Sequence, residues 1–121
     1  MTTDFTVTTR DTPVGPVLEF AGQLDAATAP DALAEIRELT PRPGQQLIVD
    51  LAGVLFCDSS GISALIAARN RALAAGAGIA LTAVPGHLAR TLELIGLAGL
   101  FSSYPTTEDA HNAWAATKPG Q

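Results

Sequence analysis

The 121-residue sequence has few of the side chains that mark several common protein classes. A single cysteine excludes an internal disulfide, and one cysteine with two distant histidines argues against a structural zinc site. The only lysine is Lys118, and the seven basic residues form no run or stripe. This scatter argues against nucleic acid and against anionic membrane surfaces as partners. We therefore expect no metal and no cofactor.

Long apolar runs are also missing. The first residues include an early acid and no continuous apolar segment, unlike a signal peptide, and no later stretch is long enough to span a bilayer. The simplest interpretation is a soluble cytoplasmic protein. With 47% hydrophobic residues, 5% aromatics and a formal net charge of −5, the composition fits one domain with an aliphatic core. We expect the folded part of this single domain to span about residues 5–116, followed by a tail at 117–121.

Strand patterns alternate with helix patterns, which predicts an α/β domain. The first two strands flank a short Pro/Gly turn, and such a turn can join only antiparallel neighbours, so we expect a mixed sheet of four to five strands with about four helices. Thr28, with Asp31 three residues later, predicts a capping box for the first helix. The expected strands are 5–9, 16–21, 46–51, 76–84 and 100–104, and the expected helices are 28–39, the segment after DSSG to about 75, 85–96 and 106–117.

The segment DSSG, residues 58–61, interrupts the apolar run before the second helix and allows three interpretations. Asp58 and the serines are good helix caps, because their oxygens accept hydrogen bonds from free backbone N–H groups. A serine could instead be a catalytic nucleophile, or a residue that another protein modifies. Cys57 precedes the segment and is expected to point into the core, since free cysteine is usually buried.

The enzyme interpretations are poorly supported by the sequence. The G-x-S-x-G elbow of serine hydrolases is absent, since Cys57 stands where the first glycine would be, and His87 and His111 are the only histidines available as bases. No phosphate-binding P-loop motif is present. The lack of a lysine in the body of the chain also argues against a phospho-aspartate receiver domain of similar size. We therefore expect a protein that is not an enzyme.

The segment LIVDLAGVLFCDSSGISALIAA, residues 47–68, closely resembles the core of the anti-sigma factor antagonists, which are built on a STAS domain. Three further segments agree with this resemblance. GQLD at 22–25 resembles the family's turn before its first helix, GAGIALTAV at 76–84 resembles its next strand, and LARTLELIGLAGLF at 88–101 resembles its late helix and the step into the last strand. The likeness covers about residues 17–114 and implies a STAS-type single domain.

The resemblance implies a switch that acts on transcription without contacting DNA. In the family, the serine after the aspartate, here Ser59, is phosphorylated by a partner that is both an anti-sigma factor and a serine kinase. The unmodified protein binds this partner and frees the sigma factor; the phosphorylated protein lets go until a phosphatase resets it. A monomer is expected, because one docking face must stay accessible.

The residues expected to bind the partner surround this serine. They are Asp25, Thr28, Asp58, Ser60 and Gly61. Asp25 and Asp58 also have simpler roles as a turn residue and a helix cap, and Ser60 is either a cap or a minor phosphoacceptor. Trp114 is expected to anchor the last helix. The rival function is a STAS subunit of a scaffold or lipid-transport complex, whose binding would not depend on phosphate at Ser59.

Overall fold

The computed structural model describes residues 5–117, which form five strands, four α-helices and one 3-10 helix. Strands and helices alternate along the chain after an opening pair of strands, as the sequence pattern predicts. The elements are β1 (Phe5–Thr12), β2 (Gly15–Leu24), α1 (Ala29–Glu38), β3 (Gln46–Cys57), α2 (Ser59–Ala74), β4 (Gly78–Thr82), α3 (Gly86–Leu94), η1 (Ala98–Leu100), β5 (Ser102–Tyr104) and α4 (Thr107–Thr117).

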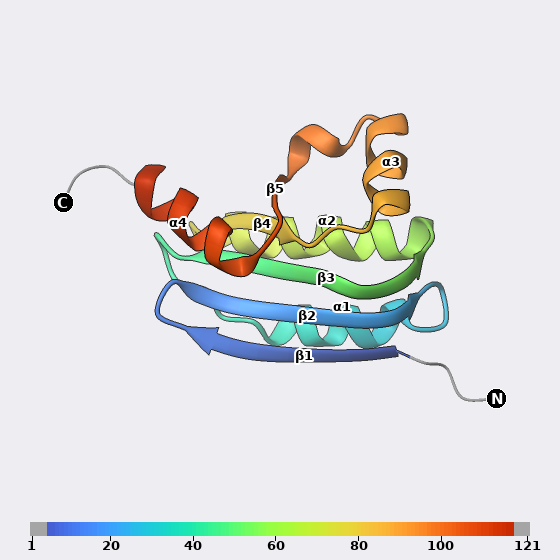
Figure 1. The fold of residues 1–121 in the computed structure, drawn as a ribbon. Coiled ribbons are helices and arrows are strands. Elements are labelled where there is room, and N and C mark those ends of the chain that lie inside the picture. Colours follow the sequence, from blue (N-terminus) through green and yellow to red (C-terminus); the bar gives the residue numbers. More distant parts are fainter. Residues whose placement is uncertain (1–4, 118–121) are drawn as a thin grey trace.

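The five strands form one mixed sheet in the order β1-β2-β3-β4-β5. β1 pairs with β2 in the antiparallel sense through a tight turn, and every other neighbouring pair is parallel. Helices α1 and α2 lie behind the sheet in Figure 1, and α4 lies in front of it. The expected fold, a mixed sheet with helices on its faces, is confirmed. In this arrangement the carboxyl ends of β2 and β3 lie at the same end of the molecule.

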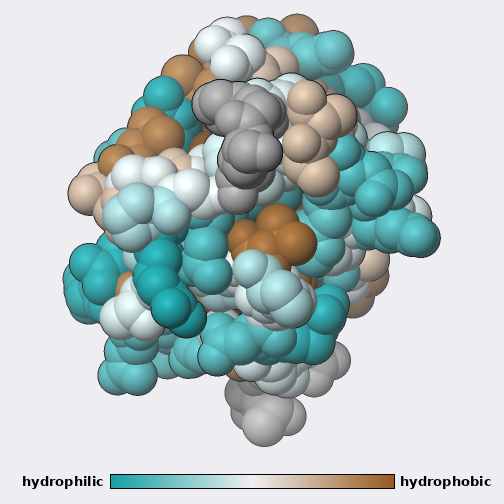
Figure 2. Space-filling model, turned by 90° about the vertical axis from the view of Figure 1, so that its left-hand side faces the viewer, coloured by the Kyte–Doolittle hydropathy of each residue, from teal (hydrophilic) through white to brown (hydrophobic). Residues whose placement is uncertain are grey.

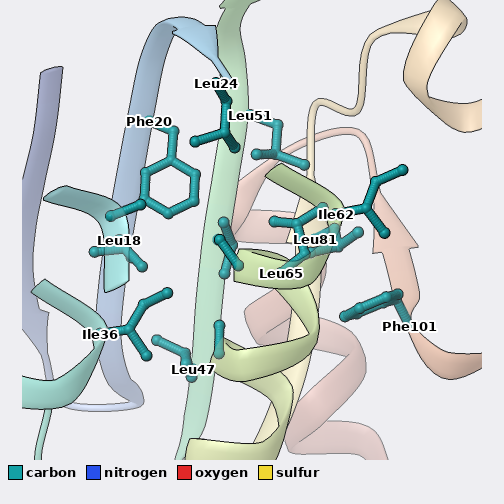
Figure 3. Close-up of a cluster of buried hydrophobic side chains, with 14 of the residues drawn as sticks. Leu18, Phe20, Leu24, Ile36, Leu47, Leu51, Ile62, Leu65, Leu81 and Phe101 are labelled. Atoms are coloured by element: carbon teal, nitrogen blue, oxygen red, sulfur yellow. The ribbon is translucent and has the colours of Figure 1, made fainter. Parts of the chain in front are cut away.

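The main hydrophobic core lies between the sheet and the helices α1, α2 and α3. Figure 3 shows its centre, where Phe20 of β2, Ile36 of α1 and Leu65 of α2 converge on the β3 side chains. A smaller cluster on the other face of the sheet joins Val17 and Ile48 to Ala110 of α4. Because the central strands are covered on both faces, they read in sequence as nearly continuous apolar runs.

The last helix is fixed by Trp114, as the sequence suggested. The indole N–H donates a hydrogen bond to the carbonyl oxygen of Gly44 at 3.0 Å, and a Cβ placed on Gly78 would lie only 2.6 Å from the indole ring. This contact holds α4 at the end of the molecule where β2 and β3 begin, an end that is mostly hydrophilic (Figure 2). α4 ends at Thr117, and residues 118–121 of the expected tail lie outside the described residues.

Strand β3 is longer than expected, reaching Cys57 instead of ending near residue 51. Its pairing with β2 shifts register twice, once after Glu19 and once after Gly22. Each shift places an extra residue in β3, as in a β-bulge, and this interrupts the alternation by which a strand is recognised in sequence. The extension brings Asp58 and Ser59 to the edge of the sheet next to the end of β2.

Candidate functional site

The parallel register of β2 and β3 brings two loops together at the carboxyl end of the sheet. Leu24 and Cys57, the last residues of the two strands, are direct neighbours across the ladder. The N–H of Asp58 then donates a hydrogen bond to the carbonyl oxygen of Leu24 at 3.2 Å. Asp25 directly follows Leu24, so the turn that begins with Asp25 and the DSSG segment start from adjacent points of the backbone.

Asp58 is the N-cap of α2. Its Oδ1 accepts hydrogen bonds from the backbone N–H groups of Ser60 at 2.8 Å and Gly61 at 3.2 Å. Two of the free donors in the first helical turn are thereby satisfied, as expected of an aspartate at this position. Of the capping candidates in the segment, Asp58 and the two serines, the structure selects Asp58.

Ser59 is the first residue of α2 and its side chain is exposed, whereas Ser60 is half-buried. Within residues 5–117, no hydrogen bond joins the Ser59 hydroxyl to another group, so it is free to react with an incoming enzyme. The carboxylate of Asp58 is held immediately before it by the capping hydrogen bonds. The geometry therefore presents one accessible hydroxyl at a helix start.

The turn at the end of β2 is closed by Asp25 and Thr28. The Asp25 Oδ1 accepts hydrogen bonds from the N–H groups of Ala27 at 3.0 Å and Thr28 at 3.2 Å. The Thr28 hydroxyl donates to the carbonyl oxygen of Gln23 at 2.8 Å and accepts from the N–H of Asp25 at 2.9 Å. The turn is therefore held by its own side chains.

The expected capping box of α1 is wrong. Thr28 does occupy the N-cap position, but its side chain makes no capping hydrogen bond to the helix. Its hydroxyl is instead used by the preceding turn, where it bonds to Gln23 and Asp25. A threonine hydroxyl can bond either to the helix that follows it or to the turn that precedes it. The turn after β2 wins here because it offers the hydroxyl both a donor and an acceptor at hydrogen-bonding distance.

Two of the five residues expected to bind a partner lie inside the protein. Thr28 is only 3% exposed, and Gly61 is buried where α2 meets the ends of both strands. A Cβ on Gly61 would lie 2.6 Å from the Cys57 Sγ and 2.9 Å from the Leu24 carbonyl oxygen. Thr28 and Gly61 are therefore not available for direct contact with a partner and act by positioning the residues around them. Asp25, Asp58 and Ser60 are partly accessible.

Cys57 packs against the main core, as expected, while remaining partly accessible. The pKa of its thiol is raised to about 11, mainly by burial and to a smaller extent by the neighbouring Asp58 carboxylate. The side chain is therefore a neutral packing group at physiological pH, not a thiolate nucleophile. It fills the space next to Gly61.

The described residues do not assemble a catalytic or metal site around Ser59. His87 is exposed in the first turn of α3, and His111 belongs to α4; no hydrogen bond links either of them to Ser59 in the part of the chain described. Among residues 5–117, no group of three or more potential metal ligands occurs. No helix in this range is both long enough and apolar enough to cross a membrane.

Residues 7–102 match the family model described as Mlab, STAS domain. The match covers well over half of the chain. The chain belongs to the STAS domain family. A comparison with curated protein sequences gave no match.

Solved structures share the fold of this chain. The crystal structure of an anti-sigma factor antagonist from Mycobacterium paratuberculosis superimposes with a TM-score of 0.80 and 28% identity, covering 93% of this chain and 95% of that one. The phosphorylated form of the Bacillus cell fate determinant SpoIIAA gives a TM-score of 0.65 at 19% identity, covering 90% and 97%. The murine anion transporter Slc26a9 gives 0.73 at 16% identity, covering 97% of this chain but only 23% of the transporter.

Sequence reasoning missed two exposed apolar residues of this STAS domain, which are separated from the DSSG segment only by Cys57. Leu55 is 72% exposed and Phe56 is 49% exposed, although both belong to β3. The sequence offers no local signal for these two, since their exposure follows from the register shift between β2 and β3.

Proposed function

We propose that this STAS domain is an anti-sigma factor antagonist controlled by phosphorylation of Ser59. In its unmodified form it binds an anti-sigma factor that has serine kinase activity, and the sigma factor is released. Phosphorylation of Ser59 by this partner ends the binding, and a serine phosphatase restores it. The protein acts in the cytoplasm and catalyses no reaction of its own. The 28% identical structure of an anti-sigma factor antagonist supports this function.

One observation carries the proposal: Ser59 is an exposed hydroxyl at the first position of α2, directly after a capping carboxylate. Kinase access requires exposure, and Ser59 is exposed while Ser60 is half-buried. The structure of phosphorylated SpoIIAA, which has the same fold, shows that this fold exists in a phosphorylated form.

The capping by Asp58 decides where a phosphate on Ser59 would lie. A phosphate carries about −1.5 to −2 charges and would normally be stabilised by free N–H groups at a helix start. Here the Asp58 carboxylate already accepts from the N–H groups of Ser60 and Gly61. The phosphate is therefore left at the surface beside Asp58, and near the turn that contains Asp25. A docked partner would have to desolvate this charge, which opposes binding while the core stays intact.

Intact mass spectrometry of the protein purified from its native cells tests the proposal. We expect a wild-type fraction with one added phosphate, which is absent from the Ser59→Ala variant and present in the matched Ser60→Ala variant. We further expect the kinase responsible to bind the unphosphorylated protein more tightly than the phosphorylated one. A wild-type protein that carries no phosphate under resting and stressed growth would contradict the proposal.

A second function has its own support: a subunit of a larger complex whose binding does not depend on phosphate. The family model that matches the chain is described by the name Mlab, and in Slc26a9 the same fold forms only part of an anion transporter. Under this function, Ser59→Ala would leave the set of co-purifying proteins unchanged. The exposed hydroxyl at Ser59 favours the phosphorylation switch.

A further inference from the structure

Near its carboxyl end, β3 exposes two large apolar side chains, which only Cys57 separates from the segment that carries Ser59. Leu55 is 72% exposed and Phe56 is 49% exposed, while Val54 just before them is only 3% exposed. Single exposed apolar residues are common on protein surfaces, and the informative feature here is that two large ones are adjacent. They lie three and four positions before Ser59.

A β-bulge explains why both side chains stay outside. Gly22 of β2 pairs with Val54, but the next residue, Gln23, pairs with Phe56, so Leu55 is an extra residue in β3. In a regular strand the side chains alternate, and Phe56 would lie on the buried side together with Val54. The bulge resets this alternation and turns Phe56 outward beside Leu55.

The neighbouring strand leaves this part of β3 uncovered. β4 pairs with β3 only from Gln46 to Asp50, so within the described residues the portion of β3 from Leu51 to Cys57 has a strand neighbour on the β2 side alone. The exposed pair therefore stands at an open part of the sheet.

The strand ends next to the pair carry negative charge. Asp25 and Asp58 directly follow β2 and β3, and residues 11–36 and 43–68, which contain these two strands' carboxyl ends, include no lysine or arginine. A second copy of the chain would bring the same carboxylates face to face, which disfavours self-association here. A partner surface that complements this region has an apolar pocket, or socket, for the two side chains and positively charged side chains at its rim to face the carboxylates.

We propose that Leu55 and Phe56 form an anchor that inserts into such a socket on the anti-sigma factor kinase that phosphorylates Ser59. The inference rests on the proposed function and adds a contact on β3 to it. Aromatic and apolar side chains at the centre of an interface, with charges at the rim, are a common arrangement in protein complexes. A bulky hydrated phosphate three residues from the anchor would keep the socket from closing over it, so the modification and the anchor act on the same contact.

The test measures the affinity of the purified kinase that phosphorylates Ser59 in vitro for wild type, Leu55→Ser, Phe56→Ser and the control Leu73→Ser. Leu73 is 48% exposed, like Phe56, but lies near the opposite end of α2. We expect each β3 variant to raise Kd at least tenfold, the size typical of an interface anchor, and the control to change it less than twofold. Phosphorylation of Ser59 in the two variants should show a raised KM with an unchanged kcat, because the anchor lies outside the reacting groups.

Two results would overturn the proposed role of Leu55 and Phe56 as an anchor for the kinase. Unchanged Kd values for both folded β3 variants would overturn the anchor while leaving the phosphorylation switch in place. A wild-type dimer that becomes monomeric in the variants would also overturn it, because the pair would then serve a second copy. If Phe56→Ser fails to fold, Leu55→Ser decides alone, since its side chain is mostly in solvent. Failure of the proposed function is seen separately, in wild type, as the absence of phosphate on Ser59, and the anchor then fails with it.

Discussion

The N–H of Asp58 donates a hydrogen bond to the carbonyl oxygen of Leu24 at 3.2 Å. This bond continues the parallel ladder of β2 and β3 by one step beyond the last strand residues and ties the DSSG segment to the turn that holds Asp25. Because Asp58 also caps α2 with its side chain, one residue links the end of β2, the end of β3 and the helix that carries Ser59. The position of Ser59 is therefore fixed by a backbone hydrogen bond of Asp58 to β2 and by the side-chain hydrogen bonds of Asp58 to α2.

Replacing Asp58 separates its structural role from its charge. Asp58→Ala removes the acceptor of two N–H groups and should lower the free energy of unfolding by about 1 kcal/mol, the usual effect of losing an N-cap. Asp58→Asn keeps an acceptor oxygen, so its free energy of unfolding should stay close to that of wild type. Urea unfolding followed by circular dichroism measures both. Equal losses in the two variants would show that charge, and not capping, is the stabilising factor.

Gly61 should tolerate no side chain. A Cβ at this position would lie 2.8 Å from the Leu24 Cγ and 2.9 Å from the Leu24 carbonyl oxygen, so α2 would have to move away from β2. We expect Gly61→Ala to lower the free energy of unfolding by about 1–3 kcal/mol, the usual range for overpacking.

Gly99 provides the matched control for this substitution. A Cβ on Gly99 meets nothing within 4 Å. Gly99→Ala should therefore change the free energy of unfolding by no more than about 0.5 kcal/mol in the same denaturation experiment, as surface substitutions usually do. Similar losses at both glycines would contradict close packing as the cause.

Cys57 should react slowly with thiol reagents. Its pKa is raised from 9.0 to about 11, chiefly by burial and then by Asp58. Two pKa units reduce the thiolate fraction at pH 8 roughly a hundredfold, and the thiolate is the reactive form. We expect alkylation by iodoacetamide at pH 8 to be slower by about this factor in the folded protein than in the urea-unfolded chain. Equal rates would mean that the thiol is not held in the buried environment.

His111 should make the fold sensitive to mild acid. Burial, and secondarily Arg10, lower its pKa below 6.5 in the folded protein, and its Nε2 is buried without a hydrogen-bond partner among the described groups. The unfolded chain then binds a proton near pH 6.5 that the folded protein does not, so stability falls as the pH decreases below 6.5.

The variant His111→Gln removes this titrating group. We expect its Tm to fall less between pH 7 and pH 5 than the Tm of wild type, with the exposed-site variant His87→Gln as the control for loss of a histidine. If His111→Gln and wild type lose Tm in parallel over this range, other groups cause the acid sensitivity.

Much of the fold could be predicted from the sequence because its signals are local. The alternation of strand and helix patterns, the tight turn after β1 and the DSSG cap each depend on residues within a few positions of one another. The resemblance carried by residues 47–68 adds the STAS architecture and points to Ser59. The structure confirms the mixed sheet and the anchoring role of Trp114.

The remaining features were decided by contacts between distant segments. The Thr28 hydroxyl bonds within the β2 turn instead of capping α1, because that turn presents a donor and an acceptor to it. Gly61 is buried because the ends of β2 and β3 close over the start of α2. The exposure of Leu55 and Phe56 depends on the register of β3 against β2, and register is set by pairing across strands, which no single stretch of sequence records.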